Sequence, residues 1–227
     1  MKIQKLQLAI MAVGLAGAMS ASATTVQFVN VDPNQTVNLT DPWISTEAYA
    51  GIYNLIVDNV ATPSFCIDVA DENNNNMFTD YYYNDLASSP LAPAGPMGLA
   101  AATDIAKLWA AYYPAASVDN QTAAALQVAI WEDIAAKATT PYSITVNGND
   151  SVTTEAADML ANLPNLTAEA NLVGLVGPND PNNNEQSYVV AVPEPTTAGC
   201  FLLGLGALAC SRRFAKNESK RERTRTI

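Results

Sequence analysis

The chain has 227 residues, with 22 acidic against 11 basic side chains and no histidine, which gives a formal net charge of −11. The absence of histidine excludes His-based catalytic triads, His-ligated zinc and most general-base schemes. Between residues 24 and 192, only Lys107 and Lys137 oppose 19 Asp and Glu, so this segment carries a net charge of −17. Such a surface repels nucleic acid and anionic lipid, and no nucleic-acid partner is expected.

Residues 1–23 have the pattern of a secretory signal peptide. Lys2 and Lys5 give a positive start, an apolar stretch follows, and Ala21-Ser22-Ala23 supplies the small residues that signal peptidase requires. The apolar stretch is shorter than the ~20 residues that a membrane span prefers, which favours cleavage over an uncleaved N-terminal anchor. We therefore expect signal peptidase to act at Ala21 and Ala23 and the body to be exported.

Residues 24–191 are long enough for one domain with its own core, and their first half has the pattern of strands. Alternating, β-branched and aromatic segments predict strands at 24–31, 47–58, 64–69 and 79–83. The remaining segments before residue 97 are a turn-rich stretch with a short strand at 34–41, a polar loop at 71–76 and a Pro/Ala linker at 88–96.

From residue 99 the apolar period changes to that of helices. The pattern predicts a helix at 99–112 ended by Pro114, a second at 122–136 capped by Asn120 or Thr122, and a third at 151–163 closed by Pro164. Short strands are expected at 142–146 and 187–192, with a loop at 179–186. This order predicts an α+β domain in which helices are inserted into a β-sandwich or barrel.

Two segments of the body together carry a recognisable pattern. Phe65-Cys66-Ile67-Asp68 lies on a predicted strand, and Gln127-Val128-Ala129-Ile130-Trp131 lies on the second predicted helix. The pair resembles the Cys-Gln thioester domains of bacterial surface proteins over residues 64–134. Leu126 stands where the T-Q-x-A-I-W motif of that family has threonine.

The resemblance implies that Cys66 attacks the carboxamide of Gln127, expels ammonia and leaves an internal thioester. Such a bond persists only where water is excluded, and the expected shielding side chains are Phe65, Trp131 and Tyr81 or Tyr82. An amine or hydroxyl on a surface partner then opens the bond and stays attached to Gln127. The alternative is that Cys66 is a small buried apolar residue and that Gln127 lies at a helix boundary.

A calcium site is a further expectation, drawn from acidic residues near Cys66. Asp71 begins a fragment with the first spacings of a calcium loop, although the glycine and bidentate glutamate positions of that motif are not matched. A polar loop is the alternative. The candidate ligands are Asp68, Asp71 and Asp80, and no other cofactor is expected.

Residues 192–227 have the three parts of a membrane-sorting segment. Pro193, Glu194 and Pro195 precede a short apolar helix at 196–210, and a basic tail at 211–227 begins with Ser211, Arg212 and Arg213. The arrangement resembles the PEP-CTERM sorting signal, which implies handling by the membrane protease-transpeptidase exosortase. Positive flanks stay cytoplasmic, so the body lies on the far side of the membrane. An uncut tail anchor is the alternative.

The sequence therefore predicts an exported, non-enzymatic surface or extracellular-matrix protein, anchored transiently in the membrane and then present at the cell surface or outside it. Its expected partners are signal peptidase, exosortase, and an extracellular polysaccharide or a surface amine or hydroxyl group. A non-reactive or calcium-assisted matrix module, associated with exopolysaccharide in a biofilm, is the second hypothesis. An extracellular hydrolase is a third, without a nucleophile or carboxylate pair to support it.

Overall fold

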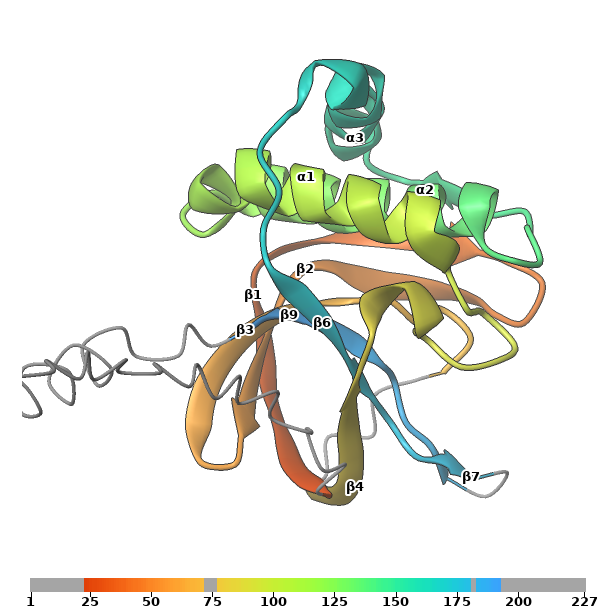
Figure 1. Ribbon diagram of the computed structural model, residues 1–227. Coiled ribbons are helices and arrows are strands. Elements are labelled where there is room, and N and C mark those ends of the chain that lie inside the picture. Colours follow the sequence, from red (N-terminus) through yellow and green to blue (C-terminus); the bar gives the residue numbers. More distant parts are fainter. Residues whose placement is uncertain (1–22, 72–76, 181–182, 193–227) are drawn as a thin grey trace, which may run out of the picture.

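The computed structural model describes residues 23–71, 77–180 and 183–192 (Figure 1). Ala21, the sorting motif at 193–195 and the basic pair Arg212 and Arg213 lie outside these residues. The predictions of a signal peptide and of a sorting signal therefore stay predictions from the sequence.

An antiparallel sheet forms the base of the domain. Its strands are β1 (Thr24–Thr40), β2 (Ser45–Val57), β3 (Val60–Cys66), β4 (Met77–Asn84), β5 (Thr145–Asn147), β6 (Leu172–Val176) and β9 (Tyr188–Ala191). The strand order is β2-β3-β9-β6-β4-β1-β5, and β1 also pairs with β2, so the pairings form a closed circuit. A small separate ribbon joins β7 (Asn179–Asp180) to β8 (Asn183–Asn184).

The long β1–β2 ribbon bends because its register shifts twice, between Phe28 and Asn30 and again between Val31 and Asn34. Each shift is a bulge, which bends a strand and increases its twist. Gly51 lies opposite the second shift, where an added Cβ would lie 2.3 Å from the Pro33 carbonyl oxygen. Only glycine allows the two backbones to approach this closely. The bend lets β1 pair with β4 at its start and with β5 at its end.

The helices lie together on one side of the sheet (Figure 1). They are α1 (Gly98–Ala116), α2 (Asn120–Lys137) and α3 (Asp150–Asn162), and the short 3-10 turns η1 (Leu86–Ser88) and η2 (Leu163–Asn165) accompany them. Helix α2 contacts α1, α3, β1 and β2, and buried residues surround it on every side. A helix that is apolar all round belongs in the core, and α2 is the central element of this domain.

The structure confirms the α+β class, with α1, α2, β5 and α3 inserted between β4 and β6. Several predicted details were wrong. Pro114 does not end the first helix, because it lies in the last turn of α1, where the proline removes only one late backbone bond. Neither Asn120 nor Thr122 caps α2. Asp119 is the cap, and its carboxylate accepts from the Thr122 N–H at 2.8 Å.

Three segments in the second half of the chain also differ from the sequence prediction. The predicted strand at 142–146 is shorter and is β5, and β6 was not predicted at all. Part of the predicted loop at 179–186 pairs as β7 and β8. Within the described part of the chain, no helix combines the length and the apolarity needed to cross a membrane.

Candidate functional site

The site is built where β3 ends against the middle of α2. Register pairing between β2 and β3 stops at Tyr53 and Ser64, while β3 continues to pair with β9 through Cys66 and Tyr188. β2 pairs with β1 along its whole length, and before Tyr53 β1 is its only partner among the described strands, so the edge of β3 at Cys66 is open to α2. Gln127 reaches this edge from the buried helix.

The side-chain amide of Gln127 pairs with the backbone of Cys66 as a residue of a neighbouring strand would. The Cys66 N–H donates to Gln127 Oε1 at 2.8 Å, and Gln127 Nε2 donates to the Cys66 carbonyl oxygen at 2.8 Å. Both residues have no exposed surface, although 61 positions separate them in the chain. Buried backbone groups require partners, and the pairing of β2 with β3 stops before Cys66. The two hydrogen bonds from Gln127 therefore satisfy the N–H and the carbonyl of Cys66 in place of β2. The structure therefore brings together the two residues that the sequence singled out.

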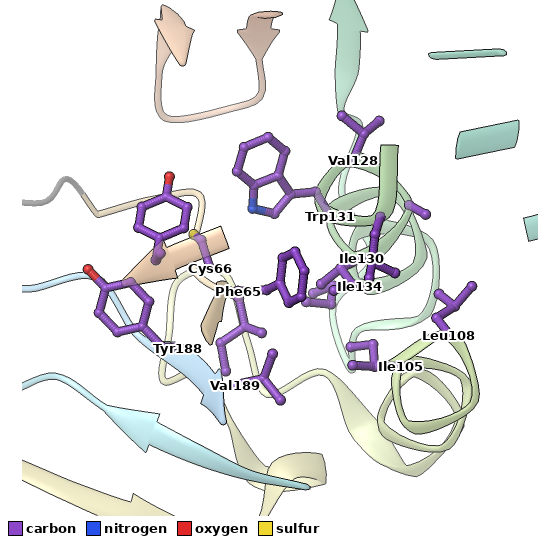
Figure 2. Close-up of a cluster of buried hydrophobic side chains, with 14 of the residues drawn as sticks. Phe65, Cys66, Ile105, Leu108, Val128, Ile130, Trp131, Ile134, Tyr188 and Val189 are labelled. Atoms are coloured by element: carbon purple, nitrogen blue, oxygen red, sulfur yellow. The ribbon is translucent and has the colours of Figure 1, made fainter. Parts of the chain in front are cut away.

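The thiol of Cys66 is fully buried. Its sulfur donates to the Asp68 carbonyl oxygen at 3.2 Å and accepts from the Asp68 N–H at 3.4 Å. Figure 2 shows the indole nitrogen of Trp131 turned toward the sulfur. That N–H forms no hydrogen bond of normal geometry among the described residues, so its influence on the thiol is electrostatic.

Burial is the dominant influence on the thiol, and it raises the pKa of Cys66 far above the ordinary value. The Trp131 N–H and the Asp68 backbone oppose this rise in the pKa, while the carboxylates of Asp68 and Asp71 add to it. The thiol is therefore protonated at neutral pH. Any attack on Gln127 has to move the S–H proton in the same step, because a free thiolate is not available here.

Phe65 supports the site from the opposite face of β3, since neighbouring strand residues point to opposite sides. Its ring is fully buried and meets Trp109 edge to face at a centroid distance of 5.3 Å. Tyr113, 6.4 Å away from the Phe65 ring, stacks on Trp109. Phe65 therefore fixes β3 to α1, while Trp131 is the side chain that covers the sulfur.

Sequence reasoning missed a buried polar layer next to the thiol. Tyr53, Tyr188, Glu185 and Gln186 contribute to it, and all are less than one-tenth exposed. Tyr81, one of the side chains that the sequence suggested as a shield, is buried and donates from its hydroxyl to the Gln186 carbonyl oxygen at 2.8 Å. The residues before β9 were expected to be a loop, so no periodic pattern indicated that Glu185 and Gln186 were buried.

Asp68 is the titratable group of this layer with the clearest consequence. It is 3% exposed, and burial, followed by the neighbouring Asp71 carboxylate, raises the pKa of Asp68 from 3.8 to about 8. The folded state thus favours the protonated acid. Its stabilising contribution is complete below about pH 4 and is lost as the pH rises through about 8.

We expect Asp68→Asn to remove this pH dependence. Between pH 5 and 8 the folded state binds one proton that the unfolded state does not. The free energy of unfolding therefore falls by about 1.4 kcal/mol for each unit that the pH rises. Urea denaturation at several pH values should therefore give wild type a steeper decline than Asp68→Asn. Asp80→Asn, at an exposed position, is the control and should decline as wild type does. Equal slopes for wild type and Asp68→Asn would contradict the assignment.

The calcium candidates are not assembled as the sequence suggested. Asp68 is buried, Asp71 is half-buried and Asp80 is exposed. Among the described residues, no group of three or more His, Cys, Asp or Glu side chains is placed to hold a metal. Residues 72–76, which contain the rest of the predicted loop, lie outside that description, so calcium binding stays a prediction.

The arrangement has two chemical capacities. Gln127 can act as a structural clip, which means that its two hydrogen bonds hold the end of β3 in place. Alternatively, its side-chain carbonyl carbon can react with a nucleophile held beside it. Comparisons with family models, with curated proteins and with solved structures found no match to this chain. The function has to be argued from this geometry and from the sequence pattern.

Proposed function

We propose that this chain is an exported bacterial surface or extracellular-matrix protein that attaches to a partner through a thioester between Cys66 and Gln127. One observation supports this most. A strand cysteine and a helix glutamine, 61 residues apart, meet in the buried core, with the carboxamide held by two hydrogen bonds of 2.8 Å to the cysteine backbone. Two groups fixed on one scaffold react with effective concentrations of about 10⁵–10⁸ M, provided that they are well oriented.

The closing step balances without a cofactor. The Cys66 sulfur bonds to the Gln127 side-chain carbonyl carbon, and the bond from that carbon to Nε2 breaks. The S–H proton leaves with the departing amide nitrogen as ammonia. The raised pKa of Cys66 fits this scheme, because proton and nitrogen depart together and no thiolate has to accumulate.

In the capture step the sulfur is the leaving group instead of the nucleophile. An amine or hydroxyl on the partner attacks the same carbon, the sulfur departs as a thiol with the proton of the nucleophile, and an amide or ester joins the partner to residue 127. The thioester is consumed, so each chain reacts once and no catalytic cycle follows. Burial by Trp131, which is 2% exposed, would keep water from reaching the bond first.

The proposed setting of this body comes from the sequence at its two ends. We propose a barrel-like body with inserted helices, preceded by a cleaved signal peptide and followed by a hydrophobic helix and a sorting motif for exosortase. The closed circuit of strand pairings supports the barrel-like description. The acidic body, with its net charge of −17, suits an extracellular matrix in which cations are plentiful.

A non-reactive matrix module is the second candidate, and one observation favours it. Gln127 already satisfies both backbone groups of Cys66, and the thiol has its own partner in the Asp68 carbonyl, so the pair is complete as a structural clip. In this case the matrix association would rest on non-covalent or calcium-assisted contacts.

A fluorescent primary amine separates the two candidates. The body, residues 24–192, is incubated with the amine and run on a denaturing gel. Wild type is expected to carry dye covalently, up to one molecule per chain, whereas Cys66→Ala and Gln127→Ala should carry none. Gln121→Ala is the matched control on the same helix, because Gln121 bonds to Glu155 instead, and it should label as wild type does. Unlabelled wild type with a thiol that alkylates fully in denaturant would support the structural clip.

A further inference from the structure

A pocket of about 360 Å³ lies between the β1–β2 ribbon and the chain that follows β3. Most of its wall is apolar and is formed by Phe28, Val31, Leu39, Ile44, Ala48 and Val69. Trp131 also lines the pocket, so it ends at the same indole whose nitrogen faces Cys66. The covalent chemistry of Cys66 and Gln127 leaves the polar side chains of this pocket without a role.

Gln186 is the polar residue that points most clearly to a ligand. Its side chain is 8% exposed and lines the pocket. The Nε2 group donates to the carbonyl oxygens of Asp68 and Asp71, each at 3.4 Å, but Oε1 has no hydrogen-bond partner among the described residues. Buried acceptors almost always have a donor. This unpaired acceptor is buried beside the pocket, so a ligand in the pocket that donates to it would supply the missing partner.

The charged residues of the pocket indicate which kind of hydrogen-bond donor would bind there. Glu47 lies at the exposed rim and Asp71 lies further in, and of the described residues that line the pocket none is lysine or arginine. The pocket is therefore negative within a body that is itself strongly acidic. The wall also has hydroxyl donors on Thr46, Tyr49 and Tyr53, but its negative charge favours a cation with N–H groups over a neutral sugar.

We propose that this pocket binds a guanidinium group on an apolar stem, such as an arginine side chain of a partner protein. The N–H groups donate to Gln186 Oε1 and to the carboxylates of Asp71 and Glu47. Tyr49 and Trp131 contribute aromatic rings to the same wall. This binding is non-covalent and does not depend on the thioester.

Two features favour guanidinium over ammonium. The wall is largely apolar, and a guanidinium group is more weakly hydrated than an ammonium group, so it enters such a site more readily. The acceptors come from different elements, namely β2, the segment after β3 and the residue two before β9. A planar group with five donors can reach several of them at once while it stacks on an aromatic ring.

The test uses the full-length chain in mild detergent and three blocked amino acids, N-acetyl amides of arginine, citrulline and lysine, followed by calorimetry. The arginine probe is expected to bind about tenfold more tightly than citrulline, because a hydrogen bond to a charged group is the stronger kind. It should also bind more tightly than lysine, because the guanidinium group is more weakly hydrated and has five donors in one plane. Citrulline has the same shape without the charge, so equal binding of citrulline and arginine would overturn the proposal. So would tighter binding of lysine, or no binding of any probe. An arm with free arginine and an arm with an arginine-containing peptide separate a small-molecule source from a protein source.

Variants locate the binding in this pocket. Glu47→Gln is at an exposed position, so the fold should tolerate it, and the affinity for arginine should fall several-fold. Asp158→Asn, on the exposed face of α3, is the matched control and should bind as wild type does. Unchanged affinity in Glu47→Gln together with Gln186→Met would overturn the assignment. Cys66→Ala should bind normally, so failure of the thioester would leave this result unaffected.

Discussion

Replacing Trp131 with alanine is expected to lower the free energy of unfolding by about 3–5 kcal/mol, the usual range for truncating a buried tryptophan. Trp131 is 2% exposed, is among the largest buried side chains, and lies between the pocket and the Cys66 sulfur. The substitution leaves a cavity in the core and removes the cover of the thiol. Urea denaturation measures the first effect, and the rate of thiol alkylation in the folded protein measures the second.

Trp43→Ala is the matched control for this variant. Trp43 is 38% exposed and rests edge-on against Tyr142 at a centroid distance of 4.9 Å, so its loss should cost less than about 2 kcal/mol. Trp131→Phe keeps an aromatic ring and leaves a smaller cavity, so it should lose less stability than Trp131→Ala. Equal losses for Trp131→Ala and Trp43→Ala would show that Trp131 is not the central packing element described above.

Replacing Gln127 with alanine is expected to lower the free energy of unfolding by about 2–6 kcal/mol. The substitution leaves both the N–H and the carbonyl of Cys66 buried without partners, and each such group costs about 1–3 kcal/mol. Gln121→Ala, which breaks only a side-chain bond to Glu155 near the surface, should lose about 1 kcal/mol or less. A similar loss for both variants would contradict the clip geometry at Cys66.

Gln127→Glu makes the same claim testable by pH. A protonated carboxyl can accept from the Cys66 N–H and donate to the Cys66 carbonyl, as the amide does, whereas an ionised carboxylate faces that carbonyl without a proton to donate. The variant should therefore approach wild-type stability in acid and lose stability as the pH rises through the raised pKa of the new acid. If the stability of Gln127→Glu changes with pH as that of wild type does, residue 127 does not donate to the Cys66 carbonyl.

Much of the fold could be predicted from local pattern. The alternating segments near 24–31, 47–58 and 64–69 lie within or overlap observed strands, and the helical periods near 99–112 and 122–136 lie within α1 and α2. β6 escaped prediction because Leu172–Val176 is a short apolar run with a central glycine and no alternation. Gly174 is required there, since an added Cβ would lie 2.2 Å from the Ser89 hydroxyl, and that contact depends on the tertiary fold.

The site was predictable only in part. The resemblance to thioester domains named Cys66 and Gln127, and the structure places the two in contact. Their backbone-to-amide geometry could not be predicted, because it depends on where β2 leaves β3 and on the rotation of α2. Gln186 and Glu185 could not be predicted either, since a polar run before a strand ordinarily indicates a surface loop.

The most direct test of the account is the intact mass of the body, residues 24–192, measured without reduction or prior amine treatment. A thioester lacks the ammonia that closure expels, so wild type should be roughly 17 Da lighter than its sequence mass. Methylamine should then add roughly 31 Da, which gives a product roughly 14 Da heavier than the sequence mass. Cys66→Ala should have its full sequence mass in both conditions. A wild-type body with full mass, and with Cys66 alkylated stoichiometrically in denaturant, would contradict the thioester and leave Gln127 as a structural clip.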